Sequence, residues 1–264
     1  MGSRDIQKGL DVRLDFLSDL IIQEANPRLR VTILDLDLAH FNSVVDFATK
    51  VSQTSHRLDL VVLFAGINLG HFEKSNDGHE LCVQVNVLSN TFMSLLLLPK
   101  VLATAQDHFG SMGQAFHSLM HGPPAGGEGG ILNYMASPKS FSPLRRYPDT
   151  KLFVSLIVRK LGSELSRLQQ DRPNPAVIVN CVCPGTICTG ADNNLPFWMR
   201  IPMNLNRALR ASSNGYYVAD NQIQELPQFA NSPRGNEFSE KLWTEILSLG
   251  KMVDIEISLK SLSA

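Results

Sequence analysis

This chain of 264 residues has little that marks a nucleic-acid, membrane or secreted protein. Its net charge is only −1, with 24 basic and 25 acidic residues, so its charge favours neither nucleic acid nor an anionic membrane as partner. No apolar run approaches the roughly 18–20 residues of a membrane-spanning helix. Residues 1–8 lack the apolar region of a signal peptide. The sequence therefore predicts a cytoplasmic protein.

Cysteine is also scarce, and its placement argues against a metal site. The four cysteines are Cys82, Cys181, Cys183 and Cys188. They do not form the two spaced pairs of a zinc site, and three lie in or just after one apolar stretch, which is typical of buried thiols in a reducing compartment. His117 and His121 are four residues apart, but no carboxylate or cysteine accompanies them. We therefore expect no bound metal.

Glycine is missing where a nucleotide-binding fold needs it. A dinucleotide-binding α/β domain opens with a strand, a glycine-rich turn and a helix whose N-terminus binds the pyrophosphate. No glycine cluster precedes the first expected strand of this chain. The glycine-rich stretch 126–130 precedes a later expected strand and does not open a helix, so a surface loop is the better interpretation.

The apolar pattern that is present predicts alternating strands and helices. Helices are expected at 6–23, 41–51, 81–98 (ended by Pro99), around Tyr147 and near 238–249, and strands at 31–36, 60–64, 130–135 and 177–182. The run 60–64 is continuously apolar, as in a parallel strand buried on both faces, and 104–129 is expected to be a long loop. The alternation predicts an α/β fold with a doubly wound parallel sheet. We expect one domain over 1–264, with 190–234 covering the substrate.

Tyr147 and Lys151 are the most informative residues. A spacing of four places both side chains on one face of a helix. There the ammonium group can stabilise a phenolate and bring the tyrosine pKa, ordinarily about 10, toward working pH for proton exchange with a carbonyl or alcohol. The alternative is an exposed helix face on which both side chains are solvated.

What surrounds this pair resembles the short-chain dehydrogenase/reductase family, in particular its fungal members. The Tyr147 helix is followed by an apolar strand and then by Cys183-Pro184-Gly185-Thr186-Ile187-Cys188-Thr189. Further matches are Leu34-Asp35-Leu36-Asp37-Leu38, Phe64-Ala65-Gly66 in place of the usual Asn-Ala-Gly, and Val85-Asn86-Val87. The resemblance covers residues 3–189. It implies a Rossmann-like fold and an oxidoreductase that uses NADP, or NAD, to interconvert a small-molecule ketone and a secondary alcohol, in secondary metabolism.

The resemblance also implies roles for individual residues. Tyr147 would be the proton donor, Lys151 would hold the nicotinamide ribose, and Asn86 would hold a water beside the lysine. The other residues implied to contact the cofactor are Arg4, Asp37, Ala65, Gly66, Pro184, Gly185, Ile187 and Thr189. Of these, Arg4 stands where the family selects the 2′-phosphate of NADP and Asp37 where it meets the adenine. Asn86 could instead be a structural amide, and Asp37 an N-cap for the helix at 41.

The catalytic serine of the family normally ends the strand before the tyrosine helix. If that strand is 130–135, the usual two serines fall on Met135 and Ala136, and Ser137 comes one position late. Ser137 is then the candidate and Ser140 the second choice. The alternative is that Ser137 is only a turn residue.

The first strand, phosphate loop and first helix of the family therefore have no counterpart in this sequence, which predicts an N-terminally truncated Rossmann-like domain. Two hypotheses follow. The first is an oxidoreductase with impaired cofactor binding, and the second is a cofactor-free protein that binds a small molecule or takes part in a non-redox step. Exposed strand edges would favour a homo-oligomer.

Overall fold

The computed structural model describes residues 1–19, 24, 26–105, 110–115, 129–170, 177–182, 217–219 and 222–253. In chain order its elements are β1 (Gly2–Ser3), α1 (Ile6–Ser18), β2 (Leu34–Asp35), α3 (Phe41–Thr54), β3 (Leu60–Leu63), α4 (Leu81–Val83), η1 (Gln84–Ser89), α5 (Asn90–Thr104), β4 (Gly110–Ala115), α6 (Ile131–Met135), η2 (Pro138–Ser140), α7 (Arg146–Leu168), β5 (Val177–Val182), β6 (Tyr217–Ala219), β7 (Gln222–Gln224) and α8 (Pro233–Met252).

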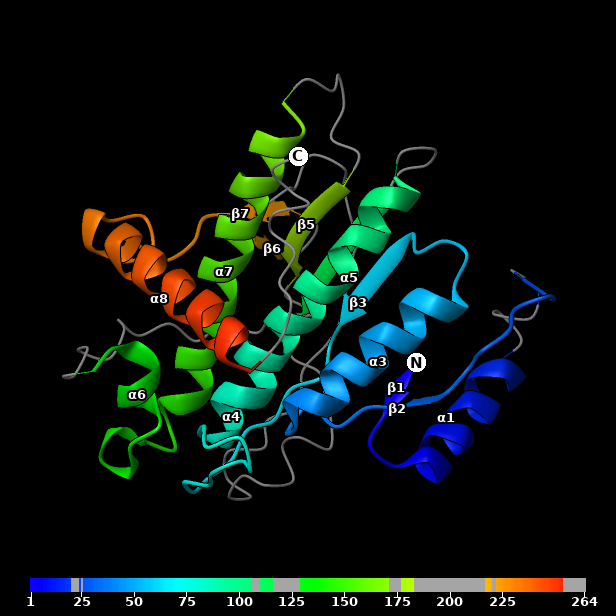
Figure 1. The fold of residues 1–264 in the computed structure, drawn as a ribbon, viewed down its shortest axis with the longest axis horizontal. Coiled ribbons are helices and arrows are strands. Elements are labelled where there is room, and N and C mark those ends of the chain that lie inside the picture. Colours follow the sequence, from blue (N-terminus) through cyan, green and yellow to red (C-terminus); the bar gives the residue numbers. More distant parts are fainter. Residues whose placement is uncertain are drawn as a thin grey trace.

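The described strands form two sheets. The larger has the order β3-β4-β5-β6-β7, and every neighbouring pair is parallel except β6 with β7. The smaller consists of β1 and β2, also parallel. Helices α3, α5 and α7 lie side by side over one face of the larger sheet, and α8 crosses α7 on the outside (Figure 1). The expected α/β fold with a parallel, Rossmann-like sheet is confirmed.

The apolar stretch from Leu81 to Thr104 forms the central helix of the core. It passes from α4 through the π-helical turn η1 into α5, and Leu88, Phe92 and Val101 are completely buried. By length and hydropathy this helix could cross a membrane, but 89% of its most apolar window is buried inside the protein. Core helices of globular proteins can be as long and as apolar as membrane spans. The burial of this helix is that of a core helix.

Pro99 does not end this helix, contrary to the prediction. It lies inside α5, which continues to Thr104. A proline inside a helix removes one hydrogen bond at a cost of about 3 kcal/mol. Burial of Val101 and a hydrogen bond from Leu58 N–H to Thr104 Oγ1 (2.8 Å) stabilise the turn that follows it.

The largest correction concerns the strand expected at 130–135. That segment is the short helix α6, whereas the strand next to β3 in the sheet is β4, within the stretch 104–129 that we expected to be a loop. Gly129 and Gly130 have positive φ (93° and 97°) and turn the chain, and the Glu245 carboxylate accepts from the N–H groups of Ile131 and Leu132 (both 2.8 Å). Capping from a distant helix therefore decides the structure of an apolar segment whose pattern is ambiguous by itself.

The strand β3 is not buried on both faces, which is a second correction. Leu60, Val62 and Phe64 are 52%, 46% and 59% exposed, whereas Val61 between them is buried. Among the described strands, β3 pairs with β4 alone. One side of β3 therefore presents an apolar surface.

The ends of other elements also differ from the prediction. The expected strand 31–36 is a strand only at Leu34–Asp35, and α1 ends at Ser18. The N-terminus of α3 is capped by Asp77, whose Oδ2 accepts from Phe41 N–H (2.8 Å). Asp37 is not the N-cap: its Oδ1 accepts from Ala39 N–H (2.9 Å) in the turn before the helix. The sequence alone could not show that a residue 36 positions away would cap α3.

Candidate active site

The N-terminal turn of α7 brings Tyr147 and Lys151 together as the spacing predicts. Lys151 Nζ lies 5.2 Å from the centroid of the Tyr147 ring. Lys151 is only 6% exposed, whereas Tyr147 is half-buried. The ammonium group of Lys151 is therefore held beside the phenol ring in a position that is largely withdrawn from water. The solvated-face alternative is therefore wrong for Lys151.

Asn86 lies in the π-helical turn η1 and joins the chain that follows β3 to α7. Its Oδ1 accepts from Ile67 N–H (2.8 Å), and its Nδ2 donates to Ile67 C=O (2.9 Å) and to Thr150 Oγ1 (3.1 Å). Thr150 in turn donates to Tyr147 C=O (2.8 Å). The side chain of Asn86 thus fixes the first turn of α7 against the chain that follows β3, and its role in holding a water beside the lysine remains a prediction. A π-turn inside an α-helix is a frequent feature of functional sites.

Gly66 follows β3 and lies against the side chains of Asn86 and Lys151. A Cβ atom built on Gly66 would be 3.1 Å from Asn86 Oδ1 and 3.5 Å from Lys151 Nζ. The absence of a side chain there leaves room for the lysine to approach the backbone. Ala65 is held from the same helix, because Asn90 Nδ2 donates to its carbonyl (3.1 Å). Tyr147, Lys151, Asn86 and Gly66 therefore form one cluster at the carboxyl end of β3.

Asn90 and Thr150 belong to this cluster but were missed from the sequence. Asn90 follows Asn86 by four residues in the same apolar run, so it extends a polar face along a helix that is otherwise apolar. Both side chains are buried and bonded. A second amide at helical spacing was the signal that could have revealed Asn90.

Arg4 and Asp37 lie at the other sheet. Arg4 follows β1 and Asp37 follows β2, and because these strands are parallel, both residues lie at the same, carboxyl edge. This is the edge at which open α/β sheets bind ligands. The N-terminus of α1, which also lies there, is occupied by a carboxylate: Asp5 Oδ1 accepts from Lys8 N–H (3.0 Å).

Ser137 does not end a strand, so the premise of its assignment was wrong. It is the N-cap of η2, where its Oγ accepts from Lys139 N–H (3.3 Å). The last strand before α7 along the chain is β4. Ser118 follows β4 by three residues in the sequence but lies outside the described residues. Ser137 remains a prediction as a catalytic residue. The predicted Pro184, Gly185, Ile187 and Thr189 also lie outside the described residues, as do His117 and His121.

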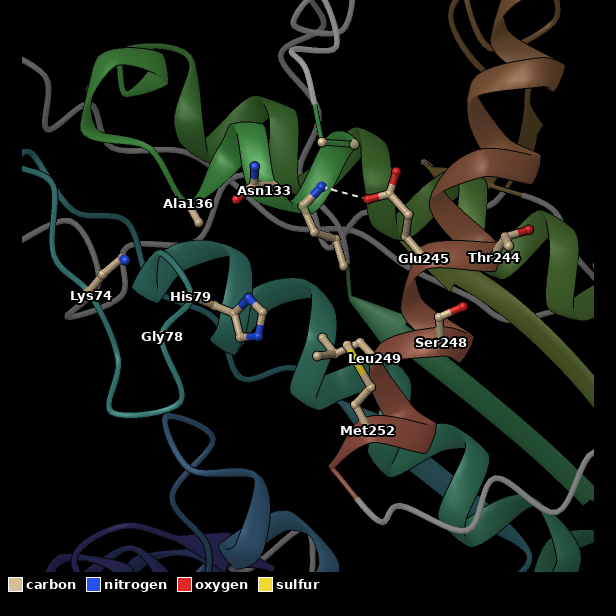
Figure 2. Close-up of a pocket in the computed structure, with 13 residues that line it drawn as sticks. Lys74, Gly78, His79, Asn133, Ala136, Thr244, Glu245, Ser248, Leu249 and Met252 are labelled. Atoms are coloured by element: carbon tan, nitrogen blue, oxygen red, sulfur yellow. Dashed lines mark hydrogen bonds between the residues drawn. The ribbon is translucent and has the colours of Figure 1, made fainter.

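A cavity of about 460 Å³ lies apart from this cluster, between α6, α8 and the chain before α4 (Figure 2). Leu132 and Asn133 form one wall, Leu249 and Met252 a second, and His79 a third. Burial lowers the pKa of His79, so its imidazole is neutral near neutral pH. The Glu245 carboxylate in this cavity is already used to cap α6.

Comparisons with known proteins agree with the motifs. No protein-family model matches the chain. It is 30% identical to the short chain dehydrogenase yanD of Aspergillus niger, over 94% of this chain and 81% of that protein, and 27% identical to the short chain dehydrogenase macD of Penicillium terrestre, over 98% and 85%.

Two solved structures share the fold. An uncharacterized protein of Mycobacterium paratuberculosis matches with a TM-score of 0.61 at 19% identity, over 95% of this chain and 83% of that one. RhlG of Pseudomonas aeruginosa, solved as an active-site complex with NADP, matches with a TM-score of 0.55 at 19% identity, over 83% of each chain. At these identities the structures show the fold alone.

Proposed function

Because this chain belongs to the short-chain dehydrogenase/reductase family, we propose that it is an NADP-dependent oxidoreductase that interconverts a ketone and a secondary alcohol. The observation that carries the proposal is the cluster at the end of β3, in which Lys151 Nζ lies beside the Tyr147 ring. The chain supplies there an acid and a buried cation that stabilises its conjugate base. Together they can protonate a carbonyl oxygen as a hydride adds to the carbon.

The proposed chemistry assigns each step to a residue of this cluster. Lys151 and the space beside Gly66 would hold the nicotinamide end of the reduced cofactor, which would supply a hydride for the carbonyl carbon. Tyr147 donates its phenolic proton to the carbonyl oxygen, so that the alcohol forms without a free alkoxide. Lys151 stabilises the phenolate that remains until it regains a proton from solvent, and general acid catalysis of this kind contributes about 10²–10⁴-fold. Asn86 keeps the first turn of α7 in place through Thr150.

The described residues fit one end of the cofactor better than the other. Lys151 and the space beside Gly66 suit the nicotinamide ribose, and in sequence Pro184, Gly185, Ile187 and Thr189 follow β5 as in the family. The N-terminus of α1, the helix that follows β1, does not substitute for a glycine-rich phosphate loop, because the Asp5 carboxylate already accepts an N–H there and would repel the diphosphate. Arg4 is the nearest cation in sequence, and we propose it for the 2′-phosphate.

The Asp5 cap also supports a second candidate, a cofactor-free protein that binds a small molecule or takes part in a non-redox step. An anion-binding helix N-terminus needs free N–H groups, and here a carboxylate uses one. In this candidate Tyr147 and Lys151 would bind or polarise a ligand oxygen without hydride transfer.

Calorimetric titration with NADPH and NADH separates the two candidates. The oxidoreductase is expected to bind NADPH at micromolar concentration and to reduce a reactive dicarbonyl probe such as phenanthrenequinone. Tyr147→Phe should keep NADPH binding but lose turnover by at least about a hundredfold, since it removes the acid. Lys151→Met should weaken NADPH binding and lower turnover. A parent protein that binds neither nucleotide would contradict the oxidoreductase, and full turnover by Tyr147→Phe would contradict the role of the tyrosine.

The substrate class and assembly are further parts of the proposal. The fungal relatives suggest a small-molecule substrate of secondary metabolism, and we propose a cytoplasmic site of action. The exposed apolar side chains of β3 favour a homo-oligomer, since an apolar strand face is stabilised when a second copy covers it.

A further inference from the structure

A fully buried ion pair lies immediately beside the candidate active site. Arg146 Nε is 3.5 Å from Glu80 Oε2, and the two side chains are 1% and 0% exposed. Buried charges are expensive to desolvate, and well-packed apolar residues in the same place are often at least as stable. Such a pair is therefore weak evidence for stability, and another reason for it must be found in its contacts.

Arg146 contacts several parts of the chain that leads into α7. Its Nη1 donates to Met135 Sδ (2.7 Å) in α6, and its Nη2 donates to Ser140 Oγ (3.0 Å) in η2. Its guanidinium also lies 5.5 Å from the ring centroid of Phe141. A planar guanidinium with several fixed donors holds these groups in one geometry, which a lysine ammonium cannot do. Arg146 is also the residue directly before Tyr147.

Glu80 holds the other side of the cluster. It is the N-cap of α4, where its Oε2 accepts from Val83 N–H (3.0 Å), and α4 continues directly into the turn that carries Asn86. The surroundings are poorly solvated, because burial raises the pKa of Glu80 and raises that of the neighbouring Cys82 to about 12. Arg146 acts on Glu80 in the opposite direction and keeps its pKa from rising further.

We propose that Glu80 and Arg146 are positioning residues that clamp the start of the Asn86 helix to the start of the Tyr147 helix. The clamp joins the two elements at a point next to the acid, and Asn86 and Thr150 join them again one turn later. Tyr147 is thereby held between two fixed points. The proposal rests on the proposed role of Tyr147, and it predicts that loss of the pair displaces the phenol without removing any group that contacts substrate.

The test is a charge-balanced double variant, Glu80→Gln/Arg146→Met, which removes both charges together and so avoids a lone buried ion. The matched control is Lys160→Met/Glu240→Gln, which removes a more exposed ion pair (2.8 Å) from the same helix α7. Arg146→Lys is the conservative variant, because it keeps the charge and loses the fixed donors. The three variants are compared with the parent by thermal unfolding, by NADPH-dependent reduction of phenanthrenequinone and by fluorine NMR.

The NMR measurement needs neither cofactor nor substrate. The chain has four tyrosines, so protein labelled with fluorotyrosine gives a small number of resonances, and Tyr147→Phe assigns that of Tyr147. We expect the double variant to fold, to move the Tyr147 resonance toward that of an exposed tyrosine and to lose at least about tenfold in kcat with little change in KM for NADPH. Arg146→Lys should lie between the double variant and the parent in both the Tyr147 resonance and kcat. The control should match the parent.

A folded double variant with the parent's Tyr147 resonance would overturn the clamp. If the double variant does not fold, Arg146→Lys decides in the same way: an unchanged resonance overturns the clamp, and a displaced one supports it. A parent that binds no NADPH and has no turnover would count against the proposed function. In that case the fluorine resonance still decides whether the pair positions the tyrosine.

Discussion

Replacement of Asn86 by alanine tests how strongly the cluster depends on its buried amide. The variant loses three hydrogen bonds of 2.8, 2.9 and 3.1 Å, and both backbone groups of Ile67 lose these partners. A buried polar group left without a partner costs about 1–3 kcal/mol. Because Ile67 is partly exposed and water can reach it, we take the lower part of this range for each group and expect a loss of about 2–4 kcal/mol in the free energy of unfolding.

Urea unfolding followed by circular dichroism measures this loss. With a typical stability of about 5–15 kcal/mol for a folded domain, Asn86→Ala should remain folded in water, and its midpoint should fall while the slope m stays constant. Its turnover should fall as well, because Thr150 loses its partner next to the backbone of Tyr147.

Thr91→Val is the matched control in the same buried helix. The Thr91 hydroxyl donates only to Val87 C=O one turn back (2.7 Å), a carbonyl that also accepts from the backbone N–H of Asn90. Its removal should cost less than about 1 kcal/mol. If the two variants lost equal free energy of unfolding, the bonds of Asn86 would contribute no more than one local bond within the helix. That result would refute the view that Asn86 joins separate elements.

Two further predictions concern the corrected elements. Gly130→Ala should cost about 2–4 kcal/mol, because φ is +97° and the new Cβ would lie 2.8 Å from Glu245 Oε1, whereas Gly78→Ala, with φ +87° and open space around it, should cost only about 1 kcal/mol. Thermal unfolding checks this, and equal losses would contradict the Glu245 cap. Val62→Lys on the exposed face of β3 should reduce self-association in sedimentation velocity and, because association stabilises the folded chain, lower the melting temperature, and a parent that is already monomeric would contradict a homo-oligomer built on that face.

The helix that carries Tyr147 and Lys151 could be predicted because its information is local. Tyr147 and Lys151 are four residues apart on one helix, so their proximity follows from helix geometry alone. Asn86 stood out because an amide in a long apolar run must find partners, and it finds them in Ile67 and Thr150. Arg146 and Glu80 were missed because their pairing joins two helices far apart in the sequence. No local pattern around either residue indicates which residue is its partner.

The strand and helix around residues 110–135 could not be predicted for the opposite reason. The sequence of β4, Gly-Ser-Met-Gly-Gln-Ala, contains no β-branched residue, and its strand conformation comes from pairing with β3 and β5. The more apolar 131–135 looks like a strand, but Glu245 and the positive φ of Gly130 make it a helix. Tertiary contacts override local preference in both segments.

The weak local preference of β4 has a consequence for the order in which the protein folds. Ser111 pairs with Leu60 on one side and with Ile178 on the other, so both of its ladders close long loops of chain. Loop-closure entropy must be overcome before such contacts stabilise anything, and this segment has no strong preference of its own to offset that cost. The helices α5 and α7 can form from local contacts first, and we expect β4 to order late, when β3 and β5 have been brought to either side of it. Until that step, β3 presents to solvent the edge with which β4 pairs in the finished sheet.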